Sequence, residues 1–418
     1  MMVGKWLKIA LINLCVVALL GVTLRYKIIF SLPFIDQRNL HHGHSHFAFS
    51  GWITQTIMVL LIYYLQKQKQ ENPFKKYAWI LVPNLIIAYG MLISFSIQGY
   101  AFYSILFSTL SVIVSYVFAI IYWRDLKKLN INRSAHSSFK AALVFNIISS
   151  MGPLSLAFMK SNHIVNQKAH LIAEFFFLHF QYNGWFFFAC MGLLIAKLYE
   201  IIGEVKSFKT IFWILALSCI PSYFLSVPWL PIPTIIYILV VISAVMRLVA
   251  WVWFLKIIKD HISTIKKVIP KTAKWLLILA AISMSIKVVL QVGSTYYPLS
   301  QIVFGFRPII IGYLHLVLLA LISVFILGYI LTEKLIATMR ATTIGLVIFV
   351  SGVFINQVLL MIQGGAALAT KNIPYINGLL FSAALIMFSG LLLITINQIR
   401  SHLTSKKTMP VCQVCAEI

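Results

Sequence analysis

Eight of the eleven histidines occur in three short stretches of the chain. They are His41, His42, His44 and His46, then His163, His170 and His179, and finally His315. Neutral imidazole binds first-row metals and haem iron, so histidines brought together from distant segments can form a cofactor site. A single histidine in a helix is as often a hydrogen-bonded packing residue as a ligand. The chemistry therefore depends on whether the elements that carry these stretches lie side by side.

The composition indicates what those elements are. Hydrophobic residues make up 61% of the 418 residues, charged residues make up 10%, and the mean hydropathy is +0.94. Soluble domains contain about 25% charged residues. Inside a membrane the backbone must satisfy its own hydrogen bonds, which only helices and closed barrels do. Because the apolar runs lack the alternation of barrel strands, we predict an all-α, polytopic membrane bundle.

Twelve apolar runs are long enough to cross a bilayer core, which needs about 20 residues per helix. They cover about 7–31, 44–65, 77–98, 101–123, 141–159, 168–196, 210–230, 234–257, 274–293, 308–331, 343–364 and 376–398. No linker divides the chain. We therefore expect one transmembrane domain over residues 1–418, which ends in a short cytoplasmic tail at 399–418.

The basic residues indicate the orientation of the bundle. With twelve spans, 25 of the 34 lysines and arginines fall on one side, seven on the other and two within helices. Cytoplasmic loops carry such an excess, so we expect both termini in the cytoplasm of a bacterial-type inner (plasma) membrane. Because the loops are short, the net charge of +25 indicates topology in the lipid bilayer and not nucleic-acid binding.

This topology places most of the histidines near the outer surface. His41–His46 begin span 2, His179 lies at mid-depth on span 6, and His315 follows Arg307 by eight residues on span 10. Eight residues correspond to about 12 Å along a helix. Ionisable groups inside a membrane are costly and often mark functional sites. We therefore expect haem b as a cofactor, with Arg38 and Arg307 near its propionates; a plain interfacial role for either arginine stays open.

Three further ionisable residues lie deep in the predicted spans. Glu174 follows His170 by four residues, so the two share a helix face. There the carboxylate can orient the imidazole, carry protons or simply form a neutralising pair. Arg247 on span 8 and Lys287 on span 9 each need a partner or a polar path inside the bundle. Glu174, Lys287 and Arg247 together form a candidate proton path.

The histidine-bearing segments resemble the heme-copper oxidase subunit I superfamily, which includes cytochrome c and quinol oxidases and the large subunit of nitric oxide reductases. Residues 38–52 read RNLHHGHSHFAFSGW, and the histidines lie on spans 2, 6 and 10 as in that family. The resemblance implies a low-spin haem between spans 2 and 10 and a respiratory or cytochrome partner. It favours His46 or His44, and then His41, as one axial ligand, with His315 as the other.

The chain departs from the family pattern at the binuclear centre. Tyr313 stands in the place of the high-spin haem ligand, and span 7 contains no histidine to complete a copper site. His179 resembles the copper ligand of span 6, so copper is possible but its ligand set is incomplete. Because reduction of dioxygen or nitric oxide needs that centre, we expect no ordinary terminal oxidase activity and predict electron transfer or redox or gas sensing.

Two other functions stay open. The outer histidines can serve a transporter or a copper-handling permease. Alternatively, His170, His179 and Tyr313 hold a remodelled metal centre that reduces oxygen or nitric oxide, because tyrosine is also a known haem ligand. Cys412 and Cys415 form a C-x-x-C pair in the tail, which provides too few ligands for a closed zinc site.

Overall fold

The computed structural model describes residues 2–68, 70–129 and 133–407. All regular elements in these ranges are helical, and eleven helical segments are long and apolar enough to cross a membrane. The chain is therefore a multi-pass helical membrane protein that contacts lipid, as the composition predicts.

The described part of the chain forms eighteen α-helices and four short segments of other helix types. In chain order they are α1 (Met2–Ile29), α2 (Gln37–Phe47), η1 (Ala48–Thr54), α3 (Gln55–Lys67), α4 (Pro73–Gln98), α5 (Phe102–Lys127), α6 (Arg133–Ser149), α7 (Met151–Ser161), α8 (Gln167–His179), η2 (Phe180–Phe186), α9 (Phe187–Ile202), α10 (Ser207–Cys219), η3 (Pro221–Ser226), α11 (Thr234–Asp260), α12 (Ile262–Val268), α13 (Lys271–Gly293), α14 (Tyr297–Phe304), α15 (Arg307–His315), η4 (Leu316–Ser323), α16 (Val324–Thr332), α17 (Arg340–Leu368) and α18 (Ile376–Lys407). Of the four short segments, η1, η2 and η4 are π-helical and η3 is a 3-10 helix.

The expected span at 210–230 is not one continuous α-helix. α10 ends at Cys219, and the 3-10 segment η3 follows from Pro221 to Ser226. Proline has no backbone N–H to donate and its ring clashes with the preceding turn, so Pro221 stops the helix. α10 is thus a short apolar helix beside the eleven long segments.

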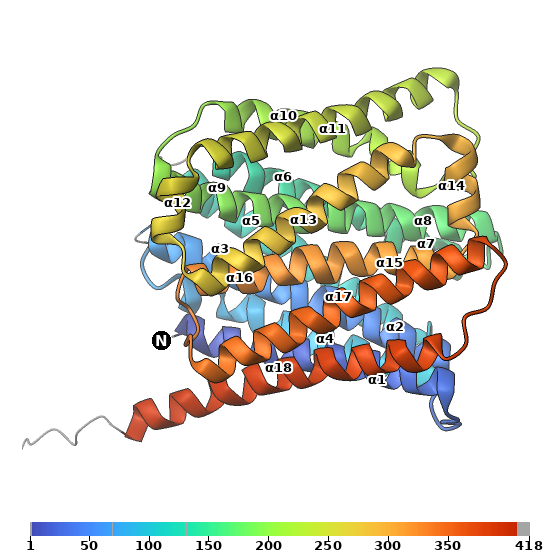
Figure 1. Cartoon of the computed structure of the whole chain (residues 1–418), viewed down its shortest axis with the longest axis horizontal. Helices are drawn as coiled ribbons and strands as arrows, with labels where there is room; N and C mark the ends of the chain where they lie inside the picture. The colour runs from blue at the N-terminus through green and yellow to red at the C-terminus, as the bar shows by residue number, and fades with distance from the viewer. Residues whose placement is uncertain (1, 69, 130–132, 408–418) are drawn as a thin grey trace, which may run out of the picture.

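Figure 1 shows the long helices side by side and roughly along one axis, with α12 and α14 at opposite ends of the bundle. The beginning of α1 and the end of α18 lie at the same end. We call it the basic end, because most lysines and arginines of the connecting segments belong to the side that carries the termini. The opposite end, where α2, α8 and α15 begin, is the histidine end. The expected count of twelve passes stays a prediction, because α10 with η3 is shorter than the eleven long segments.

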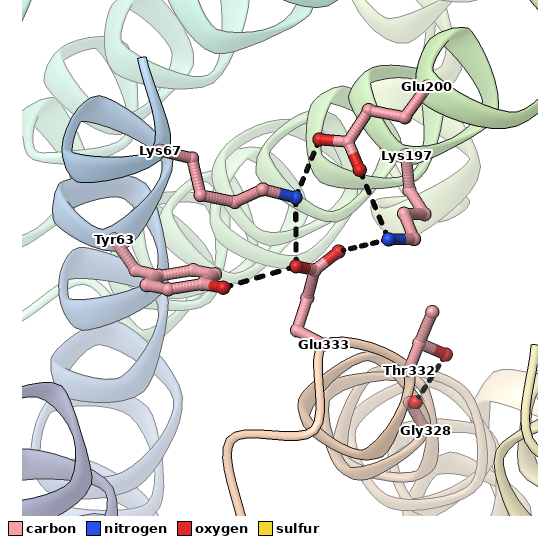
Figure 2. Close-up of polar contacts among 7 residues, drawn as sticks. All are labelled: Tyr63, Lys67, Lys197, Glu200, Gly328, Thr332 and Glu333. Carbon is pink, nitrogen blue, oxygen red and sulfur yellow. Dashed lines mark hydrogen bonds and ion pairs between the residues drawn. The ribbon is translucent and has the colours of Figure 1, made fainter. Parts of the chain in front are cut away.

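An ion cluster joins three helices at the basic end (Figure 2). Glu333, next to the end of α16, pairs with Lys67 of α3 at 2.9 Å and with Lys197 of α9 at 3.0 Å. Glu200 pairs with the same two lysines at 2.6 Å and 3.0 Å, and the Tyr63 hydroxyl donates to Glu333 at 3.2 Å. The Glu333 side chain is only 4% exposed. The cluster therefore ties the ends of the spans that carry the candidate histidines.

Glycine permits the close approach of α17 and α18, which share the most extensive helix contact in the bundle. A Cβ atom built at Gly390 would lie 2.5 Å from the Phe349 backbone nitrogen and 2.7 Å from the Gly345 carbonyl oxygen. Small residues give membrane helices this kind of close backbone contact. The pair Gly345 and Gly390 therefore sets the separation of the two helices.

Candidate functional site

The three spans that carry the candidate histidines are the most buried of the eleven long segments. Their two halves differ. In the first halves few residues are buried: three of 11 in α2, two of 13 in α8 and none of nine in α15. In the continuations most residues are buried: ten of 13 in α3, ten of 16 in α9 and all nine in α16. The histidine-bearing halves are therefore more accessible than their continuations, and they lie at one end of the bundle (Figure 1).

Each of these three spans changes to a π-helical turn where its histidines end. η1 begins two residues after His46, η2 directly after His179 and η4 directly after His315. π-turns inside α-helices are rare and frequently occur at functional sites. Because a π-helical turn occurs at the same level in three separate spans, we take this layer of the bundle as the candidate site.

His315 of α15 and His44 of α2 each have one ring nitrogen without a hydrogen-bond partner. The Nδ1–H of His315 donates to the Ile311 carbonyl oxygen at 2.8 Å. This assignment leaves Nε2 as the nitrogen with a free lone pair, the arrangement that metal-ligating histidines commonly show. The Nδ1 atom of His44 is buried and has no hydrogen-bond partner. The two imidazoles lie within Coulombic range of each other.

A group of basic side chains surrounds this histidine pair. Arg25 of α1 is within Coulombic range of His315 and of Arg307, and His41 is within range of His44 and Arg307. Arg25 was not expected at this site, because nothing in the sequence shows that α1 lies against α2. Arg25 and Arg307 therefore both belong to the basic group around the pair, and the expected role of Arg307 beside haem propionates stays a prediction.

His46 points to a different helix from His44. Its ring stacks on Phe95 of α4, with centroids 4.0 Å apart and planes at 9°, and its Nε2 lies 3.4 Å from the Tyr100 hydroxyl. His42 also contacts Tyr100, at a ring separation of 4.7 Å. A Cβ atom at Gly43 would overlap the Ser96 side chain, so glycine lets α4 approach on this side. Two opposite faces of α2 therefore carry His44 and His46.

Arg38 and Glu174 lie on the His46 side of α2. Glu174 is within Coulombic range of Arg38 and of Tyr100, and both charged side chains are exposed. Glu174 makes no hydrogen bond to His170, whose Nδ1 instead pairs with the Asn166 carbonyl oxygen at 2.7 Å. The structure therefore groups Arg38 with Glu174 rather than with the basic side chains around His44.

Of the residues expected at a remodelled metal centre, His179 and Tyr313 both lie beside Tyr182, whereas His170 is separate from them. His179 is 1% exposed and hydrogen-bonded through both nitrogens: Nε2 to the Cys219 carbonyl oxygen at 2.9 Å, and Nδ1 to the Ser226 hydroxyl at 3.2 Å. His170 is half-buried and lies nine residues earlier on α8, about 13 Å along the axis. Tyr313 packs near Tyr182. No group of three or more His, Cys, Asp or Glu residues with metal-site spacing occurs in the part of the chain that the structure describes.

The expected proton path is divided. Arg247 and Lys287 lie within Coulombic range of each other inside the bundle, whereas Glu174 interacts with Arg38 near the histidine end. Arg247 hydrogen-bonds to Gln291, which sequence reasoning did not select. The Cys412 and Cys415 pair lies outside the described residues.

No family model matches this chain, and no curated protein is significantly similar to it.

Proposed function

We propose that this chain is a membrane-embedded haem b protein that holds a low-spin haem between His44 of α2 and His315 of α15. The pairing of these two imidazoles carries the proposal. The His315 tautomer leaves Nε2 free, and the buried Nδ1 of His44 lacks a protein partner. A buried polar atom without a hydrogen bond costs free energy unless something else binds in its surroundings.

The packing around the pair supports a large planar ligand there. No residue of α15 is buried, although its continuation α16 is buried completely. A tightly packed helix interface would leave no room for a porphyrin, whereas the accessible halves of three neighbouring spans suit one. The resemblance to heme-copper oxidase subunit I agrees with this location.

Each nearby residue has a role that its chemistry supports. The Ile311 carbonyl holds the His315 ring in one tautomer and orientation, which raises the basicity of Nε2. The guanidinium groups of Arg25 and Arg307 provide positive charge for two propionates. When bound, haem with two imidazole ligands supplies reversible one-electron transfer, and it has no open position for a gas. We therefore propose electron transfer or redox sensing, with a respiratory or cytochrome partner.

His44 is the better ligand among the histidines of α2. His46 is already stacked on Phe95 and within hydrogen-bond distance of Tyr100 on another face. His41 is exposed. His44 alone combines an orphaned buried nitrogen with Coulombic contact to His315.

The proposed membrane is a bacterial-type plasma membrane with the basic end in the cytoplasm. The excess of lysine and arginine on that side supports the orientation. Both termini then lie in the cytoplasm.

Purification in detergent after expression with added haem precursor tests the proposal. We expect about one haem per chain and a reduced-minus-oxidised spectrum of bis-histidine haem b. His44→Leu and His315→Leu should lose the haem, whereas the matched variants His46→Leu and His170→Leu should retain it. A wild-type protein without haem under these conditions contradicts the proposal. Bound copper that is lost in His46→Leu, with no haem signal, would favour the permease instead.

A further inference from the structure

Arg247 and Lys287 are two buried cations that share the interior of the bundle. Arg247 on α11 is 4% exposed and Lys287 on α13 is 2% exposed. Arg247 donates to Gln291, which follows Lys287 by one helical turn on the same face of α13, so the two basic side chains lie in one region of the bundle. No ion pair between described residues includes either side chain. Charges inside a membrane protein normally pair with an opposite charge, because unpaired burial is costly. Arg247 and Lys287 therefore lack the opposite charge that normally accompanies buried cations.

Neutral oxygen atoms hold Arg247 in place from three elements. Nη1 donates to Gln291 Oε1 of α13 at 3.0 Å. Nη2 donates to the Ser218 carbonyl oxygen of α10 at 3.2 Å and to the Ser222 hydroxyl of η3 at 2.7 Å. These bonds fix the guanidinium but leave its charge uncompensated. The guanidinium also hydrogen-bonds to the Cys219 side chain. Most of its five N–H groups are thus in use, so a bidentate carboxylate or phosphate would have to displace these bonds.

Lys287 has less support than Arg247. Its Nζ lies 5.7 Å from the centroid of the Phe187 ring, and no described residue accepts a hydrogen bond from it. A cation over an aromatic face gains only about 0.5–2 kcal/mol. The three donors of the ammonium group are therefore available to a ligand.

The nearby residues do not provide the missing negative charge. Glu174, the only acidic residue deep in a predicted span, interacts with Arg38 on the histidine side of the molecule. The Cys219 thiol, close to both cations, donates to the Asn183 carbonyl oxygen at 3.6 Å, so it carries its proton. His179 accepts and donates neutral hydrogen bonds only.

From these observations we infer that Arg247 and Lys287 form a binding site for a small monovalent anion of the halide class. A monatomic anion needs no fixed geometry, so it can take the free N–H groups of both cations without disturbing the bonds that hold Arg247. It would also offset the repulsion between the two side chains. The site is separate from the histidine pair and does not depend on haem.

Chloride is the probe for this site. Thermal unfolding of the purified full-length protein in detergent is measured as gluconate is replaced by chloride at constant ionic strength. The wild-type melting temperature should rise and then saturate, because a ligand of the folded state stabilises it. Lys287→Met should remove the saturable rise, with at least about tenfold weaker chloride affinity. Lys259→Met makes the same chemical change at an exposed position of α11 and should respond like the wild type.

Equilibrium binding of radioactive chloride to the wild-type protein gives a second measurement, which decides the matter even where Lys287→Met does not fold. Saturable binding supports the site. A wild-type protein that shows neither saturable binding nor a chloride-dependent melting temperature overturns it. An equal chloride response in folded Lys287→Met overturns it as well.

Discussion

Replacing Glu333 by glutamine removes the central carboxylate of the ion cluster at the basic end while preserving its shape (Figure 2). The 4% exposed Glu333 side chain pairs with Lys67 at 2.9 Å and Lys197 at 3.0 Å and accepts from Tyr63. Breaking a buried ion pair costs about 3–5 kcal/mol. Here both lysines keep Glu200 as a partner and are 23% and 14% exposed, so we expect a loss of about 2 kcal/mol in the free energy of unfolding.

The pH dependence of this loss provides a stricter test. Burial alone would raise the pKa of Glu333, but the hydrogen bonds and charges of Lys67 and Lys197 outweigh it and hold this pKa below the ordinary value. A carboxyl whose pKa is lower in the folded state stabilises the fold above its unfolded pKa and loses that contribution as the pH falls through its folded pKa. The difference between wild type and Glu333→Gln should therefore be full at neutral pH and shrink in acid.

Unfolding in mixed micelles, titrated with a denaturing detergent at several pH values, measures both effects. Glu200→Gln is the matched control, because it makes the same change in the same cluster at a 34% exposed side chain. It should cost less than about 1 kcal/mol. Equal stability of Glu333→Gln and wild type at neutral pH, or a difference that stays constant in acid, would refute the reasoning.

Three further predictions concern packing, the candidate site and topology. Gly390→Val should destabilise the fold by about 2 kcal/mol or more, because its side chain meets the backbone of α17, whereas Gly378→Val on the same helix has open space and should be tolerated in the same unfolding assay. His179→Leu should lower the melting temperature through its lost hydrogen bonds yet leave the haem spectrum unchanged; loss of the spectrum would move the ligand site to α8. In a variant without other reactive cysteines, Val165→Cys should react with a membrane-impermeant maleimide on intact cells, and Val268→Cys only after lysis; the reverse result would invert the orientation.

The candidate site was only partly predictable from sequence. The layer that contains the histidines followed from span order and depth, and the structure places α2, α8 and α15 together at one end (Figure 1). The choice between His44 and His46 did not follow, because the two side chains point about 200° apart on a helix. Gly43 admits α4 on one face of α2, which turns His46 toward Phe95 and leaves His44 toward α1. Only this rotation of the helix distinguishes the surroundings of His44 from those of His46.

The sequence by itself determined the class of the molecule: long apolar runs and few charges specify membrane helices, and the distribution of lysine and arginine predicts their orientation. These properties depend on residues close together in the chain. Tertiary structure alone decided that Arg25 joins the histidine pair, that His170 and His179 stay apart, and that Arg247 meets Lys287 without a carboxylate. Such contacts depend on which helices pack together and on how each one is rotated, and neighbours in space are not encoded by spacing along the chain.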